Sequence, residues 1–147
     1  MAHTFSRTYV HVIFSTKHRR KTIAREVQDR LWAYLAGIGK THDMITLAVG
    51  GTEEHVHILL HLPPKLALAK AVLLLKANSS KWMSERGTEF SWQEGYGAFS
   101  VSSSNLDAVI RYIRNQEAHH RKISFEEEYR AILRGHGVEY DPRYVFG

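Results

Sequence analysis

The segment Glu54-His55-Val56-His57-Ile58-Leu59-Leu60-His61-Leu62 alternates two kinds of side chain. Its even-numbered positions from 56 to 62 are aliphatic, whereas three of its odd-numbered positions are histidines. Because successive side chains of a β-strand point to opposite faces, the pattern predicts a strand with one apolar face and one histidine-bearing face. His55 and His57 then point in the same direction, and two neutral imidazoles form half of a metal site. The alternative is a pair of histidines that face solvent or hydrogen-bond to backbone groups.

The flanking sequence predicts further strands and helices around this segment. Alternating apolar residues indicate strands near residues 8–15 and 44–49 and at the end of the aromatic stretch 90–101. Helical spacing covers residues 23–40, 66–86, about 106–120 and 125–134. The pair Gly50-Gly51 predicts a short turn that joins the second and third strands as a hairpin. This order, β-α-β-β-α-β followed by extra helices, predicts an α+β fold, a ferredoxin-like (RRM-like) sandwich with additional C-terminal helices.

The composition narrows the class of protein. The 147 residues predict one domain, with a core over about residues 5–103 and a helical and tail region over about residues 104–147. The absence of cysteine excludes disulfides and thiolate zinc sites. No apolar run reaches the ~18 residues of a membrane span and the N-terminus is unlike a signal peptide, so we expect a cytoplasmic protein. The net charge of +5 favours a polyanionic partner.

A second pair of chemically capable residues lies on the helix predicted near residues 106–120. Tyr112 and Gln116 are four residues apart and therefore share one helix face, which His120 continues. A phenol is a candidate nucleophile, although its ordinary pKa of ~10 requires a neighbouring metal or cation to stabilise the phenolate. The amide oxygen of Gln116 is a suitable ligand for Mg²⁺ or Mn²⁺. The alternative is an aromatic residue on an ordinary amphipathic helix beside a solvated glutamine.

Taken together, His55-Val56-His57 and Tyr112-Ile113-Arg114-Asn115-Gln116 resemble the two signatures of a known family. They are similar to the motifs of the single-tyrosine HUH transposases of small bacterial insertion sequences, the transposase A type related to REP-associated tyrosine transposases. The resemblance covers nearly the whole chain and includes the basic residues 17–21, Pro63-Pro64, Lys76 and residues 92–96. One departure is Glu54, where the family commonly has aspartate.

The resemblance implies an enzyme that nicks single-stranded DNA and transfers the cut strand. His55, His57 and Gln116 would hold Mg²⁺ or Mn²⁺, and Tyr112 would attack the scissile phosphate to give a 5′-phosphotyrosine and a free 3′-OH. It further implies DNA hairpins at the ends of a mobile element as substrate. The protein would be a homodimer, in which the histidines of one subunit often meet the tyrosine helix of the other.

Five basic residues are candidate DNA contacts, because lysine and arginine neutralise phosphate charge without reading sequence. They are Lys17, Arg19, Arg20, Lys21 and Lys76. The alternative for the first four is a solvated basic turn. For the whole chain, the alternatives to a transposase are a domesticated nuclease that acts on repetitive genomic hairpins, and a non-catalytic RRM-like module that binds single-stranded nucleic acid.

Overall fold

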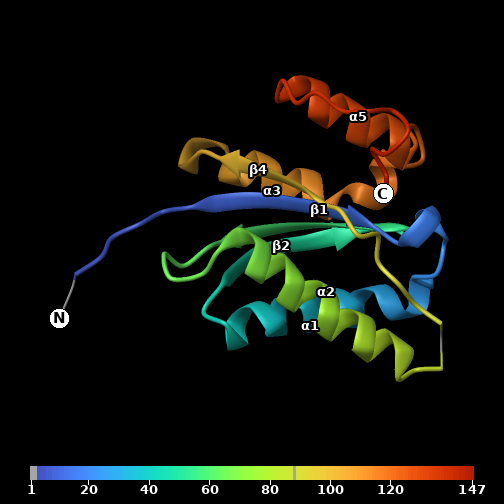
Figure 1. Cartoon of the computed structure of the whole chain (residues 1–147), viewed down its shortest axis with the longest axis horizontal. Helices are drawn as coiled ribbons and strands as arrows, with labels where there is room; N and C mark the ends of the chain where they lie inside the picture. The colour runs from blue at the N-terminus through green and yellow to red at the C-terminus, as the bar shows by residue number, and fades with distance from the viewer. Residues whose placement is uncertain (1–2, 88) are drawn as a thin grey trace.

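The computed structural model describes residues 3–87 and 89–147 and contains a four-stranded antiparallel sheet. Its strands are β1 (Tyr9–Ser15), β2 (Ile45–Gly51), β3 (His55–His61) and β4 (Gly97–Val101), in the spatial order β2-β3-β1-β4. The main helices are α1 (Arg25–Thr41), α2 (Leu68–Ser84), α3 (Leu106–Arg114), α4 (Gln116–His119) and α5 (Phe125–Gly135). The order β1-α1-β2-β3-α2-β4, followed by α3 to α5, confirms the predicted ferredoxin-like α+β sandwich (Figure 1).

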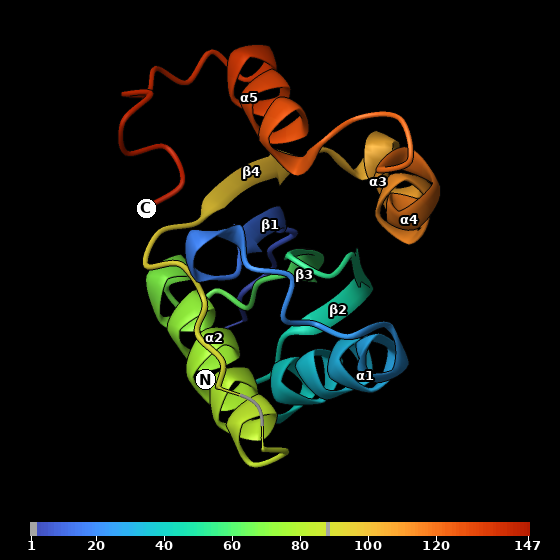
Figure 2. The same ribbon diagram turned by 90° about the vertical axis from the view of Figure 1, so that its right-hand side faces the viewer.

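Helices α1 and α2 cover one face of the sheet and enclose the larger core, as both views of the ribbon show (Figures 1 and 2). The aliphatic positions of residues 56–62 lie on this face, as the alternation predicted. They pack with alternate residues of β1 and with the apolar stripes of the two helices. Burial of each large aliphatic side chain contributes about 1.5–3 kcal/mol, so this layer supplies most of the hydrophobic stabilisation.

Helices α3, α4 and α5 lie on the opposite face of the sheet (Figure 2). Two small apolar clusters anchor them there. One joins Ile113 of α3 to Leu59 and Ala48 on the strands, and the other joins Phe125 of α5 to Ile13 of β1. The histidines of β3 lie on this second face, so they are buried under the C-terminal helices rather than exposed to solvent.

Two local predictions are wrong in detail. The helix predicted near 106–120 is divided, because α3 ends at Arg114 and Asn115 adopts φ −101° and ψ 21° before α4 begins at Gln116. Asparagine favours such breaks because its side chain competes with helical backbone hydrogen bonds. Gly50 and Gly51 do not form the hairpin turn; they are the last residues of β2, and the chain turns at residues 52–54.

Gly50 is needed inside β2 because α3 packs directly against the strand backbone there. A Cβ atom at position 50 would collide with the carbonyl oxygen of Ile113 and would lie 3.0 Å from its carbonyl carbon. The absence of a side chain therefore sets how closely α3, and Tyr112 on it, can approach the histidine-bearing face.

We expect Gly50→Ala to lower the free energy of unfolding by about 1–3 kcal/mol. The new methyl group would meet the backbone of Ile113, which cannot move aside as the end of a flexible side chain can. Gly37→Ala is the matched control, since a Cβ there would have no neighbour within 4 Å in an exposed part of α1. That change should raise the same free energy by about 0.5–1 kcal/mol. Urea unfolding measures both, and equal effects at the two positions would contradict the close-packing argument.

Candidate active site

Strand β3 directs His55 and His57 to the same side of the sheet, and both rings are fully buried. The Nδ1 atom of His55 lies 2.9 Å from Oγ1 of Thr52, and the Nδ1 atom of His57 lies 2.8 Å from Nε2 of His11. Each ring is thus fixed through one nitrogen and presents the other, Nε2, to a common centre. This is the arrangement by which neighbouring groups orient metal-binding histidines in proteins.

Gln116 and Tyr112 reach the same centre from the C-terminal helices. Gln116, the first residue of α4, is buried and places Oε1 2.9 Å from Nε2 of His55. The Tyr112 ring lies 5.7 Å from the His57 ring, measured between centroids. The structure therefore brings together the four residues predicted from sequence, and it does so within one chain.

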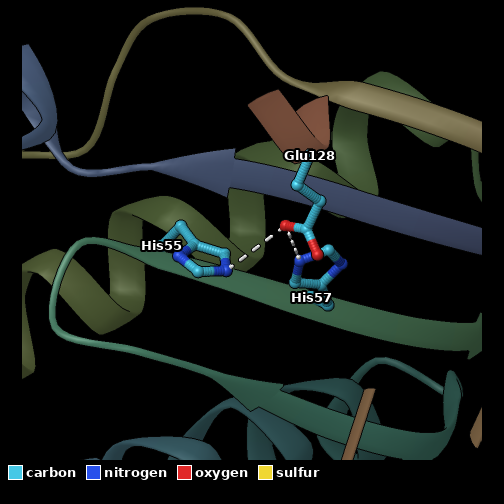
Figure 3. Close-up of side chains that lie close together, drawn as sticks. All are labelled: His55, His57 and Glu128. Atoms are coloured by element: carbon cyan, nitrogen blue, oxygen red, sulfur yellow. Dashed lines mark hydrogen bonds and ion pairs between the residues drawn. The ribbon is translucent and has the colours of Figure 1, made fainter. Parts of the chain in front are cut away.

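A fifth residue, Glu128 of α5, lies between these groups and is not predicted from the sequence. Its carboxylate hangs from α5 over the histidine pair, as Figure 3 shows, with Oε1 3.0 Å from Nε2 of His57 and 3.6 Å from Nε2 of His55. The Tyr112 hydroxyl donates a hydrogen bond to the same carboxylate. One signal was available: Glu128 is three residues after Phe125 and one before Tyr129, so it lies within the buried stripe of α5.

Two further histidines border the carboxylate. The Nε2 atom of His120 lies 3.1 Å from Oε1 of Glu128 and 3.0 Å from Oε1 of Gln116. The Nε2 atom of His119 lies 3.2 Å from the other carboxylate oxygen, yet this buried nitrogen makes no hydrogen bond. His120 extends the stripe of Tyr112 and Gln116, as the spacing predicted, despite the helix break.

Burial and Glu128 together set the protonation states. Desolvation lowers the pKa of both His55 and His11 to about 3, so these rings are neutral at pH 7. Burial, reinforced by the hydrogen bond to Glu128, raises the pKa of Tyr112 far above its usual value. Burial alone would raise the pKa of Glu128, but hydrogen bonds from His120 and His57 outweigh it and lower that pKa.

These side chains fit a divalent metal. His55, His57 and Glu128 offer ligand atoms that all lie within 4.8 Å of one another, and His119, His120 and Glu128 form a second such group. Imidazole nitrogens combined with amide and carboxylate oxygens suit divalent ions such as Mn²⁺. The buried Nε2 atom of His119 has no hydrogen-bond partner among the described residues, which is a further indication that the site accommodates a bound group.

The basic residues predicted to contact DNA divide into two kinds. Lys17, Arg20 and Lys21 are exposed in the turn after β1. Arg19 instead pairs with Glu126 of α5 at 2.8 Å and lies over the Phe146 ring.

The ammonium of Lys76 on α2 donates to the carbonyl oxygens of residues 93, 94 and 95, at 2.7, 3.1 and 2.7 Å. Burial lowers its pKa to about 8. Through these hydrogen bonds Lys76 supports the segment that precedes β4. A contact between Lys76 and DNA stays a prediction, which this geometry does not favour.

A hollow of about 190 Å³ lies beside the basic turn and is bordered by His120 of the site. Its lining combines three basic residues with three carboxylates, namely Lys21, Arg25 and Arg121 with Glu53, Glu54 and Glu117. Glu117 lies 3.0 Å from Arg25 and 3.9 Å from Arg121, so the charges of the lining offset one another and do not single out a phosphate-bearing ligand.

In the described part of the chain, no helix combines the length and the apolarity that a membrane span requires.

Comparisons with known proteins match most of the chain. A family model described as Transposase IS200 like matches residues 4–116. The transposase for insertion sequence element IS200 of Salmonella typhimurium is 27% identical over 125 residues, covering 79% of this chain and 81% of the relative. The ISDra2 transposase TnpA of Deinococcus radiodurans is 25% identical over 114 residues, covering 72% of this chain and 81% of the relative.

Two solved structures share the fold. A Deinococcus radiodurans protein described as a transposase aligns with a TM-score of 0.62 at 24% identity, covering 79% of this chain and 96% of its own. A REP-associated tyrosine transposase bound to a REP hairpin aligns with a TM-score of 0.57 at 13% identity, covering 77% of this chain and 68% of its own.

The buried neutral histidines predict a loss of stability in mild acid. The unfolded chain binds protons on His11 and His55 near pH 6.5, whereas the folded chain resists them until about pH 3, so stability falls as the pH drops below about 6.5. His120 acts in the opposite sense, because the charge and hydrogen bond of Glu128 raise its pKa despite burial. Between pH 7.5 and 5.5 we expect the free energy of unfolding in EDTA to fall by about 1 kcal/mol for each neutral ring.

The variant His11→Asn should flatten this dependence, whereas the exposed control His3→Asn should leave it unchanged. Urea unfolding series at several pH values compare the two variants with the wild type. Identical slopes for all three proteins would show that His11 does not resist protonation in the folded state.

Proposed function

The chain belongs to the family of IS200-like transposases, which are DNA-processing enzymes, and from this we propose that it cuts and rejoins single-stranded DNA through Tyr112. The observation that carries the proposal is the meeting of the Tyr112 hydroxyl, the His55 and His57 rings and the Gln116 amide at one buried centre. The sequence motifs predicted these residues, and their contacts support their use as one site.

In this proposal Tyr112 is the nucleophile, and its Oη–P bond forms as the P–O3′ bond of the substrate breaks. The phenol loses its proton in this step and the departing 3′ oxygen gains one, which leaves a 5′-phosphotyrosine and a free 3′-OH. The reverse attack by another 3′-OH rejoins strands without ATP, because the tyrosine ester preserves the phosphodiester energy. Glu128 accepts a hydrogen bond from the hydroxyl and keeps the phenol neutral and oriented before substrate binds.

His55, His57 and Gln116 would hold the divalent metal, for which we propose Mg²⁺ or Mn²⁺. A bound ion supplies a positive charge that polarises the scissile phosphate and stabilises a phenolate. For this role Nδ1 of each histidine carries the proton, so that His55 donates to Oγ1 of Thr52 and His57 donates to Nε2 of His11, and these hydrogen bonds orient the two rings. Burial keeps His55 unprotonated, so its lone pair remains free for a ligand at neutral pH.

The proposed substrate is a single-stranded DNA hairpin at the end of a mobile element. The structurally similar REP-associated transposase, which was solved with a REP hairpin, supports a hairpin, and the exposed basic turn supports a polyanion. A domesticated nuclease that acts on genomic hairpins would use the same chemistry and differ only in its host DNA. The RRM-like binding module is disfavoured, because α3 to α5 cover the sheet face on which such modules stack bases.

Three broader assignments stay predictions. Packing of α3 and α5 on the sheet supports one transposase domain over residues 1–147. A homodimer is not needed to complete the centre, because one chain supplies all of its described groups. A cytoplasmic location stays an expectation from the sequence.

We expect Tyr112→Phe to abolish a covalent DNA adduct, because the variant keeps the ring and loses only the attacking oxygen. The assay incubates the protein with Mn²⁺ and a pool of single-stranded hairpins from the DNA that flanks its gene, and detects the adduct on a denaturing gel. Tyr144→Phe, which alters an exposed ring, is the control and should react as the wild type. An adduct formed by Tyr112→Phe would assign the nucleophile to another residue.

The basic turn should contribute affinity without sequence preference. Replacement of Lys17, Arg20 and Lys21 by glutamine should weaken hairpin binding and reduce the slope of log affinity against log salt by about 0.7 for each phosphate that is no longer neutralised. Fluorescence anisotropy between about 50 and 200 mM salt measures this slope. The control replaces Lys40 and Lys70, exposed on α1 and α2, and should leave it unchanged. If the slope of log affinity against log salt were equal for the two variants, the DNA would not bind at the basic turn.

A further inference from the structure

Glu128 lies outside the part of the chain that matches the family. The family model ends at residue 116, whereas Glu128 belongs to α5, which begins at Phe125. Its side chain is nevertheless only 2% exposed and lies at the middle of the candidate site. A charged group so deeply buried requires a compensating partner.

The described residues supply Glu128 with no fixed positive charge. Its Oε1 atom faces His57, His120 and His55, at 3.0, 3.1 and 3.6 Å. Its Oε2 atom accepts hydrogen bonds from the Gln116 amide, at 3.1 Å, and from the Tyr112 hydroxyl, and it lies 3.2 Å from Nε2 of His119. Among the residues that the structure describes, neither lysine nor arginine forms an ion pair with it. Buried carboxylates in proteins are paired with cationic groups or coordinate metals.

Helix α5 holds the carboxylate in this position from both sides. The helix begins at the Ser124 N-cap, whose Oγ accepts a hydrogen bond from the Glu127 backbone at 3.2 Å. The Phe125 ring stacks on the His55 ring at a centroid distance of 4.4 Å. Tyr129, the next residue after Glu128, is buried in the same cluster. The direction of the Glu128 side chain is therefore set by packing against the histidine strand itself.

We propose that Glu128 is the anionic ligand of the divalent metal, beside His55 and His57, so that α5 is an integral part of the metal centre. This inference rests on the metal-dependent function proposed above. It assigns one carboxylate two tasks, because Oε1 faces the histidines while Oε2 holds the Tyr112 hydroxyl. The nucleophile and the metal would then be positioned by the same side chain.

The test measures the affinity of the Glu128→Gln variant for Mn²⁺. Isothermal titration calorimetry gives this affinity directly, and the loss of the free Mn²⁺ signal in electron paramagnetic resonance gives it independently. Glutamine keeps the shape of the side chain and removes its charge. We expect the affinity for Mn²⁺ to fall by at least the roughly 10- to 100-fold that the removal of a merely supporting partner causes. Glu127→Gln is the matched control on the same helix, since that side chain is exposed and glutamine can keep its capping role.

Thermal unfolding shows whether Glu128 binds the metal itself or only supports the fold. A ligand bound to the folded state alone raises its stability, so Mn²⁺ should raise the Tm of the wild type and of Glu127→Gln, and it should raise that of Glu128→Gln much less at the same concentration. Glu128→Asp, which restores the charge on a shorter side chain, should recover part of the shift. Wild-type Mn²⁺ affinity in Glu128→Gln would overturn the assignment.

The adduct assay distinguishes failure of this inference from failure of the proposed function. If Glu128→Gln binds Mn²⁺ normally while Tyr112→Phe still abolishes the adduct, the transposase mechanism stands and Glu128 is not a ligand. If His57→Ala and Glu128→Gln both lose Mn²⁺ binding while Glu127→Gln retains it, the assignment of Glu128 is supported. If the wild type binds no Mn²⁺, both the ligand assignment and the metal step of the proposed function are wrong.

Discussion

The burial of β3 on both faces is the constraint on which this structure depends. One face must be apolar to pack against α1 and α2, and the other is closed by the C-terminal helices. The ring nitrogens of His55 and His57 are thereby removed from water, so each needs a partner inside the protein. Thr52, His11, Gln116 and Glu128 meet that need, and these hydrogen bonds fix the positions of the groups that we propose to be catalytic.

The position of the tyrosine follows from a packing requirement rather than from its own contacts. Ile113 is fully buried against β2, and Gly50 allows the backbone of α3 to come that close. Tyr112 precedes Ile113, so the depth to which Ile113 packs also sets the distance from the phenol to the histidines. Gln116 follows Tyr112 by four residues and the helical spacing continues across Asn115, so the same packing also brings the amide onto His55.

The sheet and the two core helices could be predicted from the sequence because they depend on local periodicity. Spacing placed His55 with His57 and Tyr112 with Gln116, but only the resemblance to a known family implied that the two pairs meet. Alternation in residues 54–62 predicted which face carries His55 and His57. The division at Asn115 of the helix predicted near residues 106–120 was missed, because its helical spacing continues past the break. Glu128 was also missed. Its place in the apolar stripe of α5 indicated burial, but its role depends on a contact between α5 and β3, which are far apart in the sequence. The acidic run 126–128 is otherwise typical of an exposed first helical turn.

The centre joins segments far apart in the chain, and this makes its geometry a property of the whole fold. His11 comes from β1, the paired histidines from β3, and Glu128 from α5, so β1, β3 and α5 must all be in place before the ring nitrogens are satisfied. Exchange of the tyrosine helix between two copies is therefore unnecessary for the site, although it is compatible with it. The chemistry that we propose requires Tyr112, the β3 histidines and Gln116 to meet at one centre, and a single chain already brings these groups together.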